Sequence, residues 1–519
     1  MSVERNLQEM ELHRERYWLR YPQTSPLKLR WRAIAVRHCF HILPGESILE
    51  LGAGSGLWTE HLTDVLRGEN PITAAVFNSA FADQAAGKQL LNVTVVQVQD
   101  LISNLPAGSF DYIVGTAILC HNLHEQNLQA LHRLLKPGGQ ILFFEANHWN
   151  PQVFTKNVIP AIGRWAGQPH CQTAMRKYKL MKAASQQGFT QIEILPFDIV
   201  HPRIPRALIR AFQSLSYVVE HAPVIKEFCG TLYIWAKKPG GPERRSAVDL
   251  AVHPELFGST SVVVPCHNEE MNIPRLVQGL LGFYGRYIHE VIIVNDNSTD
   301  RTAAVTREIM TREPRVRLVD RTPPNGVGRA LRDGYAAATG RYILSMDCDF
   351  LYILPELRDL FDSIARGRDG AMGSRFSYQS ILVNYPFPKI LCNRGFHLLV
   401  NLVCRLHVRD LSNNLKLFRA EILKNLDIQQ PHFAANAETG LKPLLAGYDI
   451  EEVPVSWINR SMDMGSSTFK VVRVAPGYFL ALLSVLVRNR RRAAPHPAAS
   501  VLDPAPRTRQ LGGSKGQSL

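Results

Sequence analysis

Two short groups of residues have the types and spacing to do chemistry. Residues 50–56 read ELGAGSG, a loop in which three glycines alternate with small residues. Glycine tolerates positive φ and lets a ligand approach the backbone closely, so this loop is suited to a nucleotide-like ligand. Residues 347–349 read DCD. Alternate residues of a strand share a face, so both carboxylates can point at one Mg²⁺ or Mn²⁺, which would neutralise a leaving nucleoside diphosphate.

The glycine loop opens a series of motifs. A dinucleotide fingerprint would need glycine at position 57, where the sequence has leucine. The loop is followed in order by Gln99-Asp100, by FDYIV at 110–114 and by an LLKPGG turn at 134–139. Together these motifs resemble class I S-adenosylmethionine-dependent methyltransferases over about residues 30–240. The resemblance implies S-adenosylmethionine as a cofactor and six residues that bind it: Glu50, Gly52, Gly54, Gly56, Asn78 and Asp100.

One position departs from that family. The family usually ends its second strand with an acid that holds the ribose hydroxyls, and here that position is Val76. Asn78 is the candidate replacement, but a neutral amide binds a diol less well than a carboxylate does. Two interpretations therefore stay open for this half, an active methyltransferase and an inactive domain that serves as a scaffold. The residues identify no base for methyl transfer.

The acidic pair at 347–349 follows two earlier polar strand ends. SVVVPCHNEE at 261–270 is a buried strand stopped by Pro265 and followed by Asn268 and Glu269. VIIVNDNSTD at 291–300 repeats the design and places Asp296 at its strand end. Carboxylates and amides at neighbouring strand ends suit a nucleoside, whose base and ribose need hydrogen-bond partners.

This second series resembles the family 2 glycosyltransferases with a GT-A fold, and within them the dolichyl-phosphate mannose synthase-like group, over about residues 258–475. The resemblance implies an inverting sugar transfer from a nucleotide-sugar with Mg²⁺ or Mn²⁺. It assigns the donor to Pro265, Asn268, Glu269, Asp296 and Asp347, the metal to Asp347 and Asp349, and phosphate binding to Arg375, Arg394 and Arg460. Asn413 and Lys416 replace the family's glycine and arginine, which predicts an altered acceptor pocket.

Two acceptors remain open. A polyprenyl phosphate is already an anionic nucleophile and needs only cations that position it. A glycan hydroxyl would need a carboxylate base, for which Glu438 is the first candidate and Asp410 the second. A glycosyltransferase that acts on a glycan hydroxyl, beside an inactive methyltransferase domain, is the alternative to the bifunctional transferase.

Both series alternate short apolar strands with helices, which predicts parallel sheets with crossover helices. The fold class is therefore α/β, with two Rossmann-like three-layer domains, a class I methyltransferase fold and then a GT-A fold. The expected boundaries are a methyltransferase domain at 1–240, a linker at 241–257, a glycosyltransferase domain at 258–475, an apolar and basic segment at 476–492 and a disordered tail at 493–519.

Composition sets the remaining expectations. The 519 residues are 45% hydrophobic, and the eight cysteines are scattered, so a disulfide framework is not expected and a cytoplasmic setting is simplest. The net charge of +14 is partly local, because seven Lys or Arg against one acid follow residue 487. A nucleic-acid partner is therefore not expected. The apolar stretch 474–487 would rise only about 21 Å as a helix, too short to span a bilayer. It fits either peripheral membrane contact or a buried helix.

Overall fold

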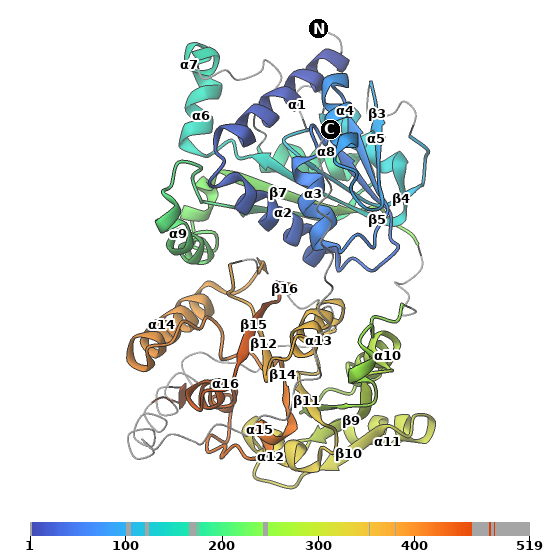
Figure 1. Ribbon diagram of the computed structural model, residues 1–519, viewed down its shortest axis with the longest axis vertical. Coiled ribbons are helices and arrows are strands. Elements are labelled where there is room, and N and C mark those ends of the chain that lie inside the picture. Colours follow the sequence, from blue (N-terminus) through green and yellow to red (C-terminus); the bar gives the residue numbers. More distant parts are fainter. Residues whose placement is uncertain are drawn as a thin grey trace, which may run out of the picture.

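The computed structural model describes residues 3–99, 105–119, 124–165, 174, 176–241, 248–351, 353–378, 380–458, 477, 478 and 482. Two α/β bodies lie one above the other in Figure 1, the N-terminal half above and the C-terminal half below. Each body is built on a seven-stranded sheet, which confirms the predicted α/β class with two Rossmann-like domains. The tail at 493–519 and all but three residues of the segment 476–492 lie outside the described residues.

The N-terminal sheet has the strand order β3-β2-β1-β4-β5-β7-β6. Its strands run parallel from β3 to β5, and β7 is antiparallel to both of its neighbours. The strands are β1 (Ile48–Leu51), β2 (Ile72–Val76), β3 (Val93–Gln97), β4 (Phe110–Thr116), β5 (Leu135–Ala146), β6 (Thr190–Phe197) and β7 (Thr231–Lys237). The helices are α1 (Val3–Arg20), α2 (Ser25–Phe40), α3 (Leu57–Val65), α4 (Ser79–Gly87), α5 (His124–Leu134), α6 (Pro151–Val158), α7 (Pro160–Trp165), α8 (Lys177–Gln186) and α9 (Arg206–Val219).

Side chains alternate between the two faces of this sheet, as the period of a strand requires. Leu49 of β1 packs in a core with α5 and α8, whereas Ile48 packs in a second core with α2 and α3. The result is the expected three-layer arrangement. One detail differs from prediction, because residues 135–139 of the expected turn are part of β5. Gly138 has a φ of 80°, and the register of β5 shifts opposite Phe110 and Tyr112.

The C-terminal sheet has the strand order β10-β9-β8-β11-β14-β12-β15, and only β14 is antiparallel to its neighbours. The strands are β8 (Thr260–Cys266), β9 (Ile288–Asn295), β10 (Val316–Asp320), β11 (Tyr342–Ser345), β12 (Gly370–Ser374), β14 (Lys416–Arg419) and β15 (Ile450–Pro454), with the separate pair β13 (Leu382–Val383) and β16 (Trp457–Ile458). The helices are α10 (Ile273–Tyr284), α11 (Thr302–Arg312), α12 (Val327–Ala337), α13 (Leu357–Ala365), α14 (Phe387–Cys404), α15 (Ala420–Lys424) and α16 (Ala435–Leu445). Short 3₁₀ turns lie at Ile225–Phe228, Pro254–Leu256 and Leu354–Glu356.

The two halves are joined by packing and by polar contacts. Ile381 and Val383 of the C-terminal half lie in the same apolar core as α2 and α3. Arg358 makes a two-pronged ion pair with Glu69 at 2.6 and 2.7 Å. His38 Nδ1 lies 2.6 Å from the Ser456 hydroxyl. Among the described residues, no helix combines the length and apolar character needed to cross a bilayer.

Candidate active sites

The acidic pair lies just beyond the carboxyl end of β11, in the middle of the C-terminal sheet. Asp347 accepts a hydrogen bond of 2.8 Å from the Asn414 amide, and Asp349 is 8% exposed. Burial and the nearby charge of Asp349 raise the pKa of Asp347 to about 6. Each of two neighbouring carboxylates disfavours the ionisation of the other, and a bound cation would favour the ionised form of both. The pair is therefore a candidate metal site. In the described part of the chain, no cluster of three or more His, Cys, Asp or Glu side chains forms a complete metal site.

The loops after β8 and β9 lie against each other at the same sheet edge. The Asn268 amide oxygen accepts from the Thr299 backbone at 2.8 Å, and the Glu269 carboxylate accepts from the Asn272 side chain at 2.6 Å. Pro265 lies in β8, immediately before this loop. The predicted donor residues are therefore brought to one edge of the sheet, together with Asp347.

Asp296 lies at the end of β9 and is held by two partners. Its carboxylate accepts from the Gly326 backbone amide at 2.6 Å and forms an ion pair with Arg321. Gly326 begins α12 with a φ of 153°, where an added Cβ would lie 2.2 Å from the Pro431 carbonyl oxygen. The position of the Asp296 carboxylate is thus fixed by its surroundings.

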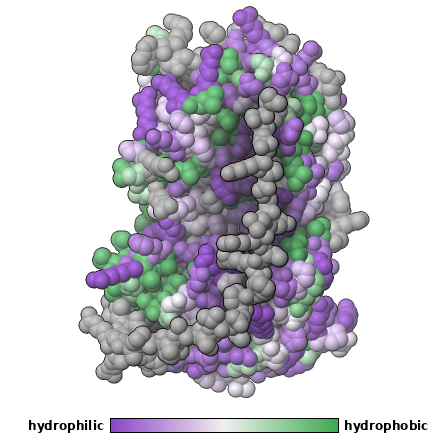
Figure 2. Space-filling view, in the orientation of Figure 1, coloured by the Kyte–Doolittle hydropathy of each residue, from purple (hydrophilic) through white to green (hydrophobic). Residues whose placement is uncertain are grey.

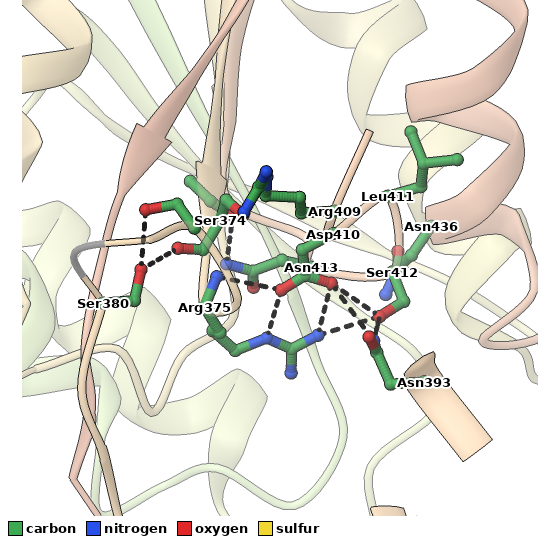
Figure 3. A network of polar contacts seen from close by, with 12 residues as sticks. Ser374, Arg375, Ser380, Asn393, Arg409, Asp410, Leu411, Ser412, Asn413 and Asn436 are labelled. Atoms are coloured by element: carbon green, nitrogen blue, oxygen red, sulfur yellow. Dashed lines mark hydrogen bonds and ion pairs between the residues drawn. The ribbon is translucent and has the colours of Figure 1, made fainter. Parts of the chain in front are cut away.

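Arg375 and Asp410 form a buried ion pair at the end of β12 (Figure 3). The guanidinium donates from Nε at 2.7 Å and from one terminal nitrogen at 2.9 Å, and the Arg375 backbone amide adds a third bond of 3.0 Å. Burial alone would raise the pKa of Asp410, but the charge and hydrogen bonds of Arg375 hold it below its ordinary range. Ser412 and Asn393 complete the network around this carboxylate.

Arg394 and Arg460 are the other two predicted phosphate-binding arginines, and the structure describes only Arg394. Arg394, on α14, lies over the Phe376 ring with its guanidinium carbon 4.3 Å from the ring centroid. It also donates to the Asn393 side chain at 2.8 Å. Arg460 lies outside the described residues.

Glu438 lies in the first turn of α16 and is 1% exposed. One carboxylate oxygen accepts from the backbone amides of Gln429 and Gln430 at 3.0 and 2.7 Å. The other lies 2.6 Å from the Lys442 ammonium. These bonds fix the Gln429–Gln430 loop against the helix, which is a structural task that the sequence did not predict.

In the N-terminal half, the glycine loop forms as predicted, with Gly52, Gly54 and Gly56 at φ values of 66°, 57° and 76°. Glu50 is buried in β1, and burial raises the pKa of its carboxyl to about 7. The Asn78 side chain caps α4 by accepting from the Ala80 amide at 3.0 Å. Asp100 lies outside the described residues.

The space over this loop is filled by the chain itself. Three charged residues of α1, Glu11, Arg14 and Glu15, are buried against the strand ends, and the cavity that remains has a volume of about 10 Å³. That is roughly the space of one water molecule. This pocket, as the described residues line it, is too small for a nucleoside.

Sequence reasoning missed several residues of these sites. Glu11, Arg14 and Glu15 lie three or four residues apart with Trp18, so they share one helical face, yet a charged face normally points to solvent. Lys416 was noted only as a replacement. Its ammonium donates to the Asn436 carbonyl at 3.0 Å and is fully buried, and burial lowers its pKa to about 7.

Comparisons with known proteins agree with this division into two halves. Residues 261–427 match the family model described as glycosyl transferase family 2, and residues 48–139 match one described as a methyltransferase domain. The chain is a fusion of a methyltransferase domain and a family 2 glycosyltransferase domain. It is therefore an enzyme, as the two series of motifs predicted.

Relatives are found for the glycosyltransferase domain. The chain is 25% identical over 250 residues to a polyprenol monophosphomannose synthase of Mycolicibacterium smegmatis, which covers 46% of this chain and 91% of that protein. It is 26% identical over 185 residues to a dolichol-phosphate mannosyltransferase of Pyrococcus furiosus, which covers 35% of this chain and 52% of that protein.

Two solved structures show a weak similarity to part of this chain. Glucosyl-3-phosphoglycerate synthase from Mycobacterium tuberculosis is 18% identical, with a TM-score of 0.36, and the match covers 47% of this chain and 85% of that one. A methyltransferase from Thermotoga maritima, described as a possible histamine N-methyltransferase, is 16% identical, with a TM-score of 0.30. That match covers 45% of this chain and 99% of the other.

Proposed function

We propose that the glycosyltransferase domain transfers a sugar from a nucleoside diphosphate sugar to a polyprenyl phosphate, with a divalent cation held at Asp347 and Asp349. The methyltransferase domain, in this proposal, uses S-adenosylmethionine. The observation that carries the proposal is the pair of carboxylates just beyond the end of β11, where burial and the charge of Asp349 raise the pKa of Asp347 to about 6. Mg²⁺ commonly binds through one or two carboxylates plus substrate phosphates, so two carboxylates are enough.

A lipid acceptor is supported by the exposed surface of α14. Leu398 and Leu402 on this helix are 73% and 76% exposed, and Leu391 and Val403 also face solvent. Figure 2 shows hydrophobic atoms gathered at the lower left of the molecule, where Figure 1 has α14. The same helix directs Asn393 toward Asp410. An apolar surface of this kind marks a contact with a partner or a membrane, and here it borders the proposed acceptor site.

The apolar surface continues onto the methyltransferase domain. Leu208 and Leu215 are exposed on α9, which contacts α14, and Val224, Ile225 and Phe228 are exposed just after it. We define the apolar face as the exposed side chains of α14, α9 and residues 224–228. A peripheral contact of this face with a membrane would present a polyprenyl phosphate to the site from the lipid side.

In the proposed reaction, an oxygen of the acceptor phosphate attacks the anomeric carbon from the side opposite the diphosphate. The new C–O bond forms as the bond to the diphosphate oxygen breaks, and the nucleoside diphosphate leaves with the electron pair and with inverted sugar configuration. A bound cation would neutralise the charge of this leaving group. No proton has to be removed, because the acceptor is already anionic. In this proposal, Arg375 and Arg394 position the acceptor phosphate.

The test is transfer from a panel of radiolabelled sugar nucleotides, with Mg²⁺ or Mn²⁺, to polyprenyl phosphate and, separately, to soluble glycans. Label in the organic phase with one donor would support the proposal. Label only in the glycans would instead support the alternative, a transferase that acts on a glycan hydroxyl. If no donor binds to the folded protein, sugar transfer by this domain is wrong.

A further inference from the structure

Helix α1 lies across the carboxyl ends of β1 and β2, where it supplies a carboxylate to three backbone amides. One oxygen of Glu11 accepts from the Gly54 amide at 3.0 Å, and the other accepts from the amides of Phe77 and Asn78 at 3.1 and 2.7 Å. Glu11 is completely buried. Backbone amides at such strand ends and loops form a site for an anion, and Glu11 occupies this one.

Arg14, one helical turn further along α1, supplies a cation to backbone carbonyls on the other side of the loop. Its guanidinium donates to the Thr116 carbonyl at 3.0 Å and to the Gly52 carbonyl. These carbonyls end β4 and β1 respectively. The strand ends therefore bind an anion and a cation side by side, and both come from α1.

The glycine loop packs closely against α1. The Ser55 hydroxyl donates to Glu15, and a Cβ added at Gly54 would lie 2.5 Å from the Glu15 carboxylate oxygen. Leu7, Met10 and Trp18 anchor the same helix in the domain, each at most 5% exposed. The pocket that Arg14 and Glu50 line among the described residues has a volume of about 10 Å³, so a nucleoside would enter it only if α1 moved.

We propose that α1 is an internal cap that competes with the methyl-donor cofactor, because Glu11 and Arg14 occupy backbone groups at the strand ends that the cofactor would otherwise use. Glu11 lies at the end of β2, where the resemblance places the ribose of the cofactor. Arg14 donates to backbone carbonyls that could instead accept from the cofactor's ammonium. This inference rests on the proposed use of S-adenosylmethionine by this domain. Cofactor binding and α1 docking are then mutually exclusive, so methyl transfer requires α1 to move away.

The test compares S-adenosylmethionine binding by calorimetry in the full chain, in Glu11→Ala/Arg14→Ala and in the matched control Glu9→Ala/Arg16→Ala. The control removes the same two charges from positions of α1 that are at least partly exposed. We expect binding at least tenfold tighter in the first variant than in the other two. Equal affinity in all three would overturn the cap and leave the methyltransferase assignment standing. No binding in any of the three folded proteins would overturn both.

Hydrogen exchange on the unmodified chain tests the same inference without a variant, and so covers the case in which Glu11→Ala/Arg14→Ala does not fold. Saturating S-adenosylmethionine should speed exchange of the α1 amides by at least tenfold, because a displaced helix loses its protection. Cofactor that binds while α1 stays protected, or becomes more protected, would contradict the competition.

Discussion

The Tyr217 hydroxyl of the methyltransferase domain donates a hydrogen bond of 3.1 Å to the Ser380 carbonyl oxygen of the glycosyltransferase domain. It also contacts the Ser377 carbonyl, and His221 Nε2 lies 3.0 Å from the Leu382 carbonyl. The segment 377–382 leads from Arg375 to α14. One domain thus holds a loop that borders the proposed acceptor site of the other.

Removing that hydroxyl should slow sugar transfer without removing a group that touches the reactants. Tyr217→Phe leaves buried carbonyls short of a donor, which costs about 1–3 kcal/mol. We expect kcat/KM for the acceptor to fall about tenfold, while donor affinity stays unchanged. The control is Tyr178→Phe, which changes an exposed tyrosine of the same domain. Equal kinetics in both variants would show that the interdomain contact does not position the loop.

Glu438 separates the two acceptor classes. Its carboxylate is bonded to Gln429, Gln430 and Lys442, and a phosphate acceptor needs no base. Glu438→Gln should therefore lower stability but leave kcat per folded molecule within about threefold of the unmodified protein. Urea unfolding and transfer kinetics measured on the same preparation check both parts. A hundredfold loss of kcat with intact donor and metal binding would favour a glycan hydroxyl as the acceptor.

The burial of His38 at the junction of the two halves makes this junction sensitive to acid. Burial lowers the pKa of His38 to about 4, from an ordinary value of 6.5. The unfolded chain therefore takes up a proton before the folded chain does, so stability is complete above about pH 6.5 and falls as the pH drops toward 4. At about pH 5 the loss from this group is about 2 kcal/mol.

His38→Gln removes that titration. The difference in free energy of unfolding between about pH 7.5 and about pH 5 should be smaller in this variant by about 2 kcal/mol. His407→Gln, at an exposed position in the other half, serves as the control and should leave the difference unchanged. The same pH dependence in His38→Gln as in the unmodified chain would contradict the assignment.

Charges on the apolar face should weaken contact with lipid. Leu398→Glu/Leu402→Glu places two acids on the exposed side of α14, where no packing is lost. We expect vesicle co-sedimentation to fall at least tenfold, with activity toward a detergent-dispersed acceptor retained. Leu91→Glu, at an exposed leucine of the methyltransferase domain away from this face, provides the comparison. Unchanged sedimentation of the double variant would argue against membrane contact through α14.

Most of the fold followed from local pattern. The alternation of apolar strands with helices predicts both sheets, because a strand buried on two faces and its crossover helix are each encoded within a few consecutive residues. The glycine loop and the acid pair at 347–349 were found for the same reason. The strand order and the antiparallel β14 depend on contacts between distant segments, and no local pattern encodes them.

The contents of the sites were harder to predict. Arg375 and Asp410 were placed in the glycosyl site with separate roles, whereas they form one ion pair across 35 positions of sequence. The sequence did not indicate that Glu11 and Arg14 are buried, since burial of charge is unusual unless partners satisfy it. Those partners are backbone groups more than 35 positions away in the sequence. No sequence pattern indicates which backbone groups will contact these side chains.

The most direct test of the central proposal is metal-dependent transfer of labelled sugar to polyprenyl phosphate, titrated with Mn²⁺ in the unmodified chain, in Asp349→Asn and in Glu421→Gln. Glu421 is an exposed acid of the same domain and serves as the control. We expect the unmodified chain and Glu421→Gln to form labelled lipid only when metal is present, and Asp349→Asn to lose at least a hundredfold in rate at any metal concentration. Labelled lipid formed equally by Asp349→Asn, or formed in full after removal of metal by a chelator, would contradict the proposal.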